Sequence, residues 1–296
     1  MRKTGDKAFS VAGIRSAAKP LVMGVVNVTP DSFSGDGIMT QQDYIAAAIA
    51  QAQAMERDGA DMIDVGGESS RPGHAPVAAG EEIRRVIPVI AGLRAISALP
   101  IAVDTTKAEV AAAALDAGAD IVNDISALRA DPAMAPLIAA RDVHVILMHN
   151  RSRAQDYTQT AKLGGSYAAP EYGDFIAAIV RDLKEHITAA EAQGMQAGQI
   201  IIDPGRGFGK TAAQNRTLIR QCGMIAALGY PVLLGPSRKS FIGQTLDLPV
   251  AERLEGTLAS CIIGWQNGAK ILRVHDVRAV RRALDMAQAI LCASGP

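Results

Sequence analysis

The sequence predicts a single-domain (β/α)8 TIM barrel, a fold of the α/β class, and three observations support this prediction. The 296 residues suffice for one such barrel, a fold that often exceeds 200 residues. Eight short runs of apolar, β-branched residues alternate with Ala-rich stretches of helical period. Each run is continuously apolar, as in parallel strands that are buried on both faces.

The expected strands follow an N-terminal extension, residues 1–20. They are Leu21–Val28, Met62–Val65, Ile101–Val103, Ile121–Val122, Val143–Met148, Ile200–Ile202, Val232–Leu234 and Lys270–Val274. We find no change in composition that would divide residues 21–296 into two domains. A doubly wound sheet is the alternative, but no G-x-G-x-x-G turn follows Val28, where that fold usually has one.

Helix-length segments separate the strands. They are Gln41–Arg57, Glu81–Ala95, Ala108–Ala117, Tyr172–Gln193, Thr211–Leu228, Ala251–Asn267 and Val277–Leu291. Several lead into a glycine, such as Gly59, Gly118 and Gly229. Glycine commonly ends a helix because it adopts the left-handed conformation at low cost.

The charge balance excludes several classes of function. Lys and Arg number 30, as do Asp and Glu, so we expect no nucleic-acid partner and no acidic-membrane surface. Aromatic residues make up only 4%, which argues against stacking platforms for single strands. The N-terminus shows no signal peptide, and no apolar run reaches the length of a membrane span. We therefore expect a cytoplasmic protein with small-molecule substrates.

Some reactive residues have an ordinary structural interpretation. Cys222, Cys261 and Cys292 lack metal-ligand spacing, so we expect reduced thiols in the core. His144 lies in an expected strand and is interpreted as a core histidine, and no histidine pair has the spacing of a zinc hydrolase. The segment Gly205–Thr211 resembles a P-loop, but Pro204 stands where the motif needs glycine, so ATP binding is not expected.

Polar residues follow the expected strands, at the end of the barrel where enzymes of this fold carry their catalytic groups. They include acids (Asp104, Asp203), amides (Asn27, Asn123) and cations (Arg71, Lys239, Arg273). Any one Asp or Asn in such a place is often only the N-cap of the next helix. Their convergence on one mouth favours a ligand that has both a hydrogen-bonding ring and an anionic group.

Eight longer motifs occur at these strand ends. They are MGVVNVTPDSFSGDG (Met23–Gly37), DVGGESSRPG (Asp64–Gly73), VDTTKAEV (Val103–Val110), VNDISAL (Val122–Leu128), LMHN (Leu147–Asn150), IIDPGRGFGKT (Ile201–Thr211), SRKSFIG (Ser237–Gly243) and RVHDV (Arg273–Val277). In sequence and order they resemble the dihydropteroate synthase family of the folate pathway. The resemblance runs from Leu21 onward and implies a (β/α)8 barrel that binds a pterin.

The resemblance also implies a reaction, in which 4-aminobenzoate is joined to 6-hydroxymethyl-7,8-dihydropterin diphosphate with the help of Mg²⁺. The products would be 7,8-dihydropteroate and diphosphate. We expect a dissociative, SN1-like path in which Asp104 stabilises a cationic methylene carbon. Sulfonamides, which mimic 4-aminobenzoate, should compete with it, and the family typically forms a homodimer through helices outside the barrel.

The roles implied by the resemblance divide into four groups. The pterin would contact Asp104, Asn123, Met148, Asp203, Phe208 and Lys239. The diphosphate would contact Asn27, Ser70, Arg71, Arg273 and His275, and Asn27 would also hold the Mg²⁺. The aminobenzoate would contact Phe33, Pro72, Ser237 and Arg238, the last two at the start of a helix. Asp104, Lys239, Arg273 and His275 would be the catalytic residues.

The loops at residues 27–39 and 67–78 are long and rich in Gly, Pro and Ser, so we expect them to move and to close over diphosphate. The chain departs from the usual family pattern at four positions. They are Asp36, Ser70, Arg206 and Pro236. At the position of Arg206 an aliphatic residue is usual.

Three other functions are compatible with parts of the sequence. A methyltetrahydrofolate-dependent corrinoid methyltransferase shares the pterin barrel but needs no diphosphate site. A Schiff-base aldolase would use Lys239, which must then have a lowered pKa in a dry pocket. A non-catalytic pterin-binding relative would keep the pocket without the reaction.

Overall fold

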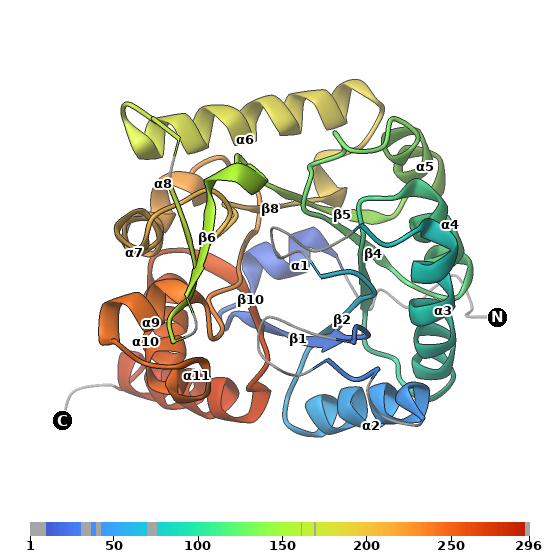
Figure 1. Cartoon of the computed structure of the whole chain (residues 1–296), viewed down its shortest axis with the longest axis horizontal. Coiled ribbons are helices and arrows are strands. Elements are labelled where there is room, and N and C mark those ends of the chain that lie inside the picture. Colours follow the sequence, from blue (N-terminus) through green and yellow to red (C-terminus); the bar gives the residue numbers. More distant parts are fainter. Residues whose placement is uncertain are drawn as a thin grey trace.

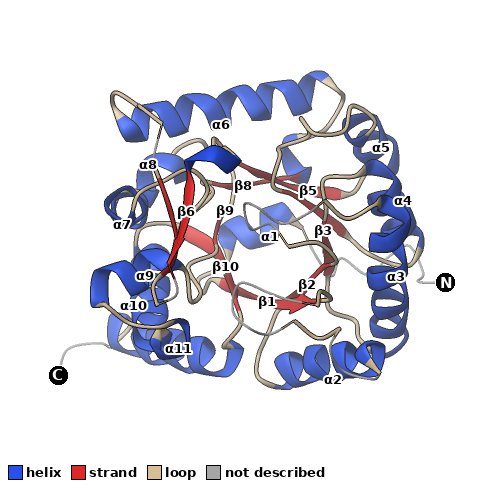
Figure 2. Ribbon diagram, in the orientation of Figure 1, coloured by secondary structure: helices blue, strands red, loops and turns tan. Residues whose placement is uncertain are grey.

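The computed structural model of the chain describes residues 10–30, 37–39, 43–69, 76–160, 162–168 and 170–293. These residues form a closed barrel of eight parallel strands with helices around it, which confirms the predicted fold class (Figure 1). Around the barrel the strands lie in the order β1-β10-β9-β8-β5-β4-β3-β2. Figure 2 shows the same ring with its strands in red and the helices outside it in blue.

The barrel strands differ from the predicted bounds by at most two residues. They are β1 (Leu21–Asn27), β2 (Met62–Gly66), β3 (Ile101–Asp104), β4 (Ile121–Asp124), β5 (His144–Met148), β8 (Ile200–Asp203), β9 (Val232–Leu234) and β10 (Ala269–Val274). His144 begins β5 and is only half-buried. The prediction that it is a core histidine was therefore wrong. Burial lowers the pKa of its imidazole.

The outer helices are more numerous than predicted. They are α2 (Tyr44–Arg57), α3 (Ala79–Ile96), α4 (Ala108–Asp116), α5 (Met134–Arg141), α6 (Phe175–Ala192), α7 (Ala212–Arg220), α8 (Cys222–Ala226), α9 (Ser240–Leu246), α10 (Leu254–Gln266) and α11 (Val277–Leu291). The single helix predicted over Thr211–Leu228 is two helices, α7 and α8, that meet at Gln221. Gly59 and Gly118 end helices with φ of 97° and 108°, as predicted.

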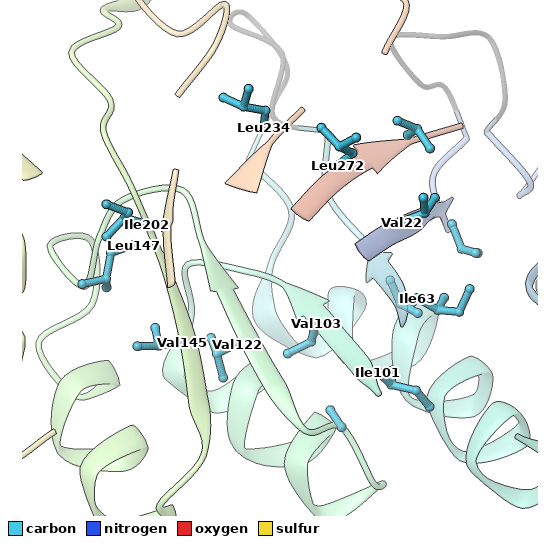
Figure 3. Close-up of a cluster of buried hydrophobic side chains, with 14 of the residues drawn as sticks. Val22, Ile63, Ile101, Val103, Val122, Val145, Leu147, Ile202, Leu234 and Leu272 are labelled. Carbon is cyan, nitrogen blue, oxygen red and sulfur yellow. The ribbon is translucent and has the colours of Figure 1, made fainter. Parts of the chain in front are cut away.

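The outer surface of the barrel packs against these helices. Val22, Ile63, Val122 and Leu272 are among the buried side chains that fill the space between strands and helices (Figure 3). A second, inner layer fills the barrel itself. It consists of Met23, Met62, Ala102, Ile121, Ile146, Ile201, Leu233 and Ile271, one residue from each strand.

The segment predicted as an N-terminal extension contains the short helix α1 (Val11–Ser16). Val11 and Ile14 of this helix are buried against the inner layer of the barrel. Because Val11 and Ile14 are apolar and cover that layer, α1 closes the barrel at the end opposite the strand termini that carry the polar residues.

An unpredicted antiparallel hairpin interrupts the connection between β5 and α6. Its strands are β6 (Tyr157–Thr160) and β7 (Gly164–Tyr167), which pair only with each other. In Figure 1, β6 runs along one edge of the barrel, beside β8 and β10 and towards α9. The hairpin therefore borders the mouth that the sequence identified as the candidate site.

The prediction for the cysteines holds in two cases of three. Cys222 and Cys261 are buried free thiols, but Cys292 is exposed beyond the end of α11, so its assignment to the core was wrong. In the part of the chain that the structure describes, no helix combines the length and apolarity needed to cross a membrane.

Candidate functional site

Strand periodicity places the polar residues inside the barrel mouth. Side chains two residues apart on a strand point to the same face. The residue two positions after each member of the inner apolar layer therefore also points into the barrel, one layer closer to the mouth. They are Val25, Asp64, Asp104, Asn123, Met148, Asp203, Gly235 and Arg273. The floor of the mouth is thus rich in acids, with one guanidinium.

Two carboxylates share the guanidinium of Arg273. Its Nε donates to Oδ2 of Asp64 at 2.6 Å, and its Nη2 donates to Oδ2 of Asp104 at 2.9 Å. The amide of Asn123 also donates to Oδ2 of Asp64, at 3.2 Å. The Asp64 side chain is fully buried, which explains why it needs both partners.

This grouping changes the acidity of the residues. Burial raises the pKa of Asp104 to about 7, against the opposing effect of Arg273, and the neighbouring Asp64 raises it further. Burial would lower the pKa of Arg273, but the charges of Asp64 and Asp104 outweigh burial and raise it. One cation between two acids stays charged, and the acid nearer the opening, Asp104, gains or loses a proton near neutral pH.

The loop after β8 is folded around the lysine of the P-loop-like segment. Lys210 is buried, and its Nζ donates to the carbonyl oxygens of Gly205 at 2.7 Å and Phe208 at 2.9 Å. Burial lowers the pKa of Lys210 to about 7. This lysine therefore stabilises its own loop.

Asp203 ends β8 at the start of this loop. Its Oδ1 accepts a hydrogen bond from the backbone N–H of Gly205 at 2.7 Å, and burial raises its pKa. Gly205 has φ of 68°, and a Cβ there would lie 1.8 Å from the carbonyl oxygen of His149. Only glycine fits this close approach of the loops after β5 and β8.

Lys239 reaches the same pocket from the loop after β9. Its Nζ donates to the carbonyl oxygen of Arg206 and lies 5.0 Å from the centre of the Phe208 ring. Burial lowers the pKa of Lys239 to about 7, with Asp203 opposing that shift. The lowered pKa meets one condition for the Schiff-base alternative, but the ammonium of Lys239 is placed equally well to donate a hydrogen bond to a ligand.

Ser237 and His275 form a pair at the ends of β9 and β10. His275 Nδ1 lies 2.9 Å from the Ser237 hydroxyl oxygen, which also accepts from the His275 backbone N–H at 3.2 Å. The predicted helix at Ser237 and Arg238 was wrong, because α9 begins at Ser240 and Arg238 has a left-handed φ of 54°. The guanidinium of Arg238 is ion-paired with Asp276, at 2.5 Å, and gives no support for its predicted contact with aminobenzoate.

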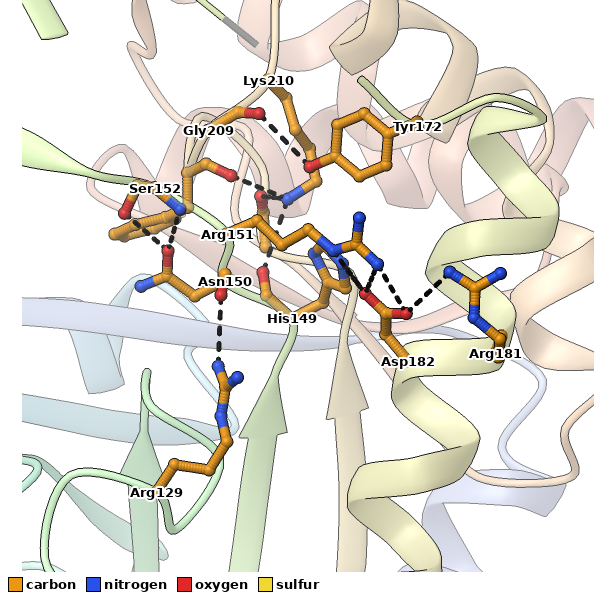
Figure 4. Close-up of polar contacts among 12 residues, drawn as sticks. Arg129, His149, Asn150, Arg151, Ser152, Tyr172, Arg181, Asp182, Gly209 and Lys210 are labelled. Carbon is orange, nitrogen blue, oxygen red and sulfur yellow. Dashed lines mark hydrogen bonds and ion pairs between the residues drawn. The ribbon is translucent and has the colours of Figure 1, made fainter. Parts of the chain in front are cut away.

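A network behind the pocket ties the loop after β5 to α6 (Figure 4). Asp182 accepts from Arg151 at 2.6 and 2.8 Å, and lies 3.1 Å from Nε2 of the buried His149. Burial would raise the pKa of Asp182, but Arg151 outweighs it and holds the pKa below its usual value. Burial lowers the pKa of His149 to about 3, so this histidine is neutral and structural.

A single cavity collects most of the predicted residues. It encloses about 1100 Å³ of empty space, counting the part that opens to solvent. Ten of the predicted site residues line it: Asn27, Asp104, Asn123, Met148, Asp203, Phe208, Ser237, Lys239, Arg273 and His275. Phe33, Asp36, Ser70, Arg71 and Pro72 lie outside the described residues, so their roles, and the mobility of the loops that carry them, stay predictions.

The sequence assigned no role to several other residues at the site. Asp64 begins one of the eight motifs, but its partner Arg273 is too distant in sequence to reveal the pairing. Tyr157 and Tyr167 line the cavity from the unpredicted hairpin. Arg206 also borders it, but its guanidinium is fully buried, lies over the ring of Phe241 at 4.7 Å, and does not face solvent.

The comparisons with known proteins agree with this geometry. The family model described as "Pterin binding enzyme" matches residues 23–275. The chain is 44% identical to the dihydropteroate synthase of Bacillus subtilis over 277 residues, which covers 94% of this chain and 90% of that protein.

Solved structures give the same result. The dihydropteroate synthase of Xanthomonas albilineans with 4-aminobenzoic acid is 41% identical, with a TM-score of 0.84 and coverage of 94% of this chain and 95% of that one. The Yersinia pestis dihydropteroate synthase with a sulfonamide drug complex is 37% identical, with a TM-score of 0.85 and coverage of 93% and 95%. Each similarity extends over nearly the whole chain and thus includes the barrel and its mouth.

Proposed function

This chain belongs to the pterin-binding enzyme family and is a dihydropteroate synthase, and from that premise we propose how the residues of its cavity divide the reaction. The enzyme is a transferase of folate biosynthesis. It joins 4-aminobenzoate to 6-hydroxymethyl-7,8-dihydropterin diphosphate, and releases 7,8-dihydropteroate and diphosphate.

The pterin binds between Asp203 and Lys239. The 2-amino-4-oxo-pyrimidine edge of a pterin has adjacent N–H donors that a carboxylate can accept together, and a carbonyl oxygen that can accept from an ammonium. Asp203 and Lys239 line the same cavity, and each is close enough to affect the pKa of the other. Asn123, Met148 and Phe208 complete this end of the pocket.

The diphosphate binds at the end of β10, against Arg273 and His275. Ser237 holds the His275 ring by its Nδ1, so the other ring nitrogen, Nε2, is directed to the ligand. Arg273 is fixed by Asp64 and Asp104, which reduces the entropy that it loses on binding. Ser70 and Arg71 would add anion contacts from the loop after β2.

Asn27 fits a magnesium ion held mainly by substrate. Among the described residues, no three His, Cys, Asp or Glu side chains are grouped to bind a metal, and Asp64 and Asp104 are engaged with Arg273. Mg²⁺ typically combines few protein oxygens with substrate phosphates and water, so one amide is sufficient. The ion would supply positive charge against the diphosphate as it leaves. Removal of divalent ions with EDTA should abolish activity, and added Mg²⁺ should restore it.

The bond to diphosphate breaks before the new C–N bond is complete, because an arylamine is a weak nucleophile. Arg273 and His275 offset the negative charge that develops on the leaving group. The dihydropterin ring delocalises the positive charge of the methylene carbon, and Asp104 stabilises it. The amine then attacks the carbon and loses one proton. This SN1-like path forms no covalent enzyme intermediate.

The 4-aminobenzoate binds at the outer end of the cavity, beside Ser237 and the start of α9. Phe33 and Pro72, from the loops after β1 and β2, would line the same subsite. A sulfonamide resembles 4-aminobenzoate in shape, and the Yersinia pestis relative was solved with such a drug complex. Sulfonamides should therefore raise the KM for 4-aminobenzoate in this enzyme without lowering kcat.

A second copy of the chain covers the outer face of α10 and α11. These helices lie side by side (Figure 1). Together they expose four large apolar side chains. They are Ile263, Met286, Ile290 and Leu291. Exposed apolar patches of this kind mark protein interfaces. Light scattering of the purified protein should give the mass of a homodimer.

The enzyme functions in the cytoplasm. Cys222 and Cys261 are unpaired thiols, and such cysteines are typical of reducing compartments. Cell fractionation should find the protein with cytoplasmic markers.

One observation carries this proposal: Asp203, at the end of β8, and Lys239, from the loop after β9, line one cavity with Arg273 and His275. The pterin end is tested by calorimetry of dihydropterin binding to Asp203→Asn. The variant should bind at least about tenfold more weakly, because the carboxylate no longer accepts both N–H groups. Unchanged affinity would show that the pterin lies elsewhere.

A further inference from the structure

The hairpin of β6 and β7 has two unlike faces. Its register pairs Tyr157 with Tyr167 and Thr158 with Ser166. Since successive side chains on a strand alternate between faces, the two tyrosines share one face with Gly165, and Thr158 and Ser166 lie on the other. The tyrosine face also carries Gln159, whose Oε1 accepts a hydrogen bond from the Tyr157 hydroxyl at 3.1 Å, whereas Thr158 on the other face is exposed to solvent.

The tyrosine face forms a wall of the substrate cavity. Tyr157, Gly165 and Tyr167 all line it, together with Phe208 and Lys239 from the opposite loops. The residues proposed to bind the pterin come from barrel strands and the loops that directly follow them. The hairpin instead lies along the edge of the barrel mouth (Figure 1). Its tyrosines therefore face the outer part of the cavity, where the second substrate enters.

The two rings are held in place by packing. Their centroids are 5.3 Å apart with an interplanar angle of 60°, an edge-to-face arrangement. A Cβ at Gly165 would lie 2.1 Å from the Tyr157 ring, so the ring occupies the space above the glycine. The Tyr167 hydroxyl is hydrogen bonded to Ser152, and burial raises its pKa, which keeps the phenol neutral.

The hairpin is also attached to α9 and to the segment that follows this helix. Arg253, which is 1% exposed, donates from Nη2 to the carbonyl oxygen of Leu163 at 3.0 Å. Gln244 of α9 donates to the carbonyl oxygen of Gly165 at 3.2 Å, and Lys162 forms an ion pair with Asp247 at 2.6 Å. A wall fixed on both sides can select a ligand by shape.

We propose that the β6–β7 hairpin is a specificity element for the arylamine substrate, and that the rings of Tyr157 and Tyr167 contact its aromatic ring. This inference rests on the synthase function proposed above. A flat aromatic amine gains from edge-to-face or offset packing on such rings. The tyrosines act on the binding of the amine, and they take no part in the departure of diphosphate.

The test compares Tyr157→Leu and Tyr167→Leu with Thr158→Ala, a control on the opposite face of the same hairpin. Initial rates are measured with each substrate varied in turn. The KM for 4-aminobenzoate should rise roughly 3- to 10-fold in both tyrosine variants, the scale of one aromatic contact. The KM for the pterin diphosphate should stay within about twofold, and the control should behave as wild type. An unchanged KM for 4-aminobenzoate, or an equal rise in both KM values, would overturn the proposal.

A second measurement uses the intact sequence and does not depend on whether the variants fold. Protein labelled with 3-fluorotyrosine is titrated with 4-aminobenzoate in the presence of inorganic diphosphate. The fluorine signals of Tyr157 and Tyr167 should shift, whereas that of Tyr230, which precedes β9 at the far end of the barrel, should not. Saturable binding without a shift of either signal would refute the proposed contact. A wild-type protein that forms no dihydropteroate would instead contradict the function itself.

Discussion

Replacing Asp104 by Asn tests the proposed stabilisation of the cationic carbon with little disturbance of the fold. The carboxylate accepts one hydrogen bond, from Nη2 of Arg273 at 2.9 Å, and an amide oxygen can accept the same bond. Arg273 keeps its 2.6 Å contact with Asp64, so no buried cation is left without a partner. The free energy of unfolding should therefore change by only about 1 kcal/mol.

The kinetic effect of Asp104→Asn should be much larger. Removal of one fixed group that stabilises developing charge typically lowers kcat by about 100- to 1000-fold, or roughly 3–4 kcal/mol. Either KM should rise by less than kcat falls. Because burial raises the pKa of Asp104 to about 7, the ionised fraction of this carboxyl increases as pH rises through neutrality. The wild-type kcat should therefore rise between about pH 6 and about pH 8, and the variant should lose this dependence.

The assay is continuous detection of released diphosphate, with thermal unfolding measured on the same samples. Asp285→Asn is a matched control, because this exposed aspartate pairs with Lys19, at 2.9 Å, on the outside of the barrel. The control should keep the kcat and the pH profile of the wild type. A kcat for Asp104→Asn within about twofold of wild type, or an unaltered pH profile, would refute the proposed role.

Three further predictions follow from other parts of the structure. Asp182→Asn should lower stability at pH 7 by about 1–3 kcal/mol, since Arg151 lowers the pKa of Asp182. A carboxyl with a lowered folded-state pKa stabilises the fold above its unfolded pKa and loses that effect as pH falls through the folded pKa. Urea titrations should therefore show the stabilities of the two proteins converging as pH falls below the usual pKa of an aspartate. Gly205→Ala should lower the free energy of unfolding by at least about 2 kcal/mol more than Gly229→Ala does. Both glycines have positive φ, but only at Gly205 would the added Cβ lie 1.8 Å from a backbone oxygen. Equal losses of stability in thermal unfolding would contradict this. Met286→Glu should convert the proposed homodimer to monomers in light scattering, and an unchanged mass would exclude the α10–α11 face as the interface.

The barrel and much of its site could be predicted because each strand is a short apolar run with a polar residue at its end. Asp104, Asn123 and Asp203 follow such runs directly, and the period of two along a strand directs them into the mouth. Asp64 follows the same rule. It begins one of the eight motifs, but the sequence assigned it no role because Arg273, which neutralises it, comes from the far end of the chain.

The local structure of the loops could not be predicted in the same way. Arg238 adopts a left-handed φ that nothing in its own residue type requires, and this delays α9 until Ser240. Helix α5 was missed because it contains Pro136, which is tolerated there because it lies in the first turn. The β6–β7 hairpin is short and polar, and it is held by Arg253, far along the chain. Such tertiary contacts leave no periodic signal in the sequence.

The most direct test of the central claim is diphosphate release by the purified protein from 6-hydroxymethyl-7,8-dihydropterin diphosphate and Mg²⁺, measured with and without 4-aminobenzoate. A synthase should release diphosphate at a rate that requires 4-aminobenzoate, with one dihydropteroate formed for each diphosphate. Tight pterin binding without any release would contradict the claim and leave a pterin-binding barrel with a different function.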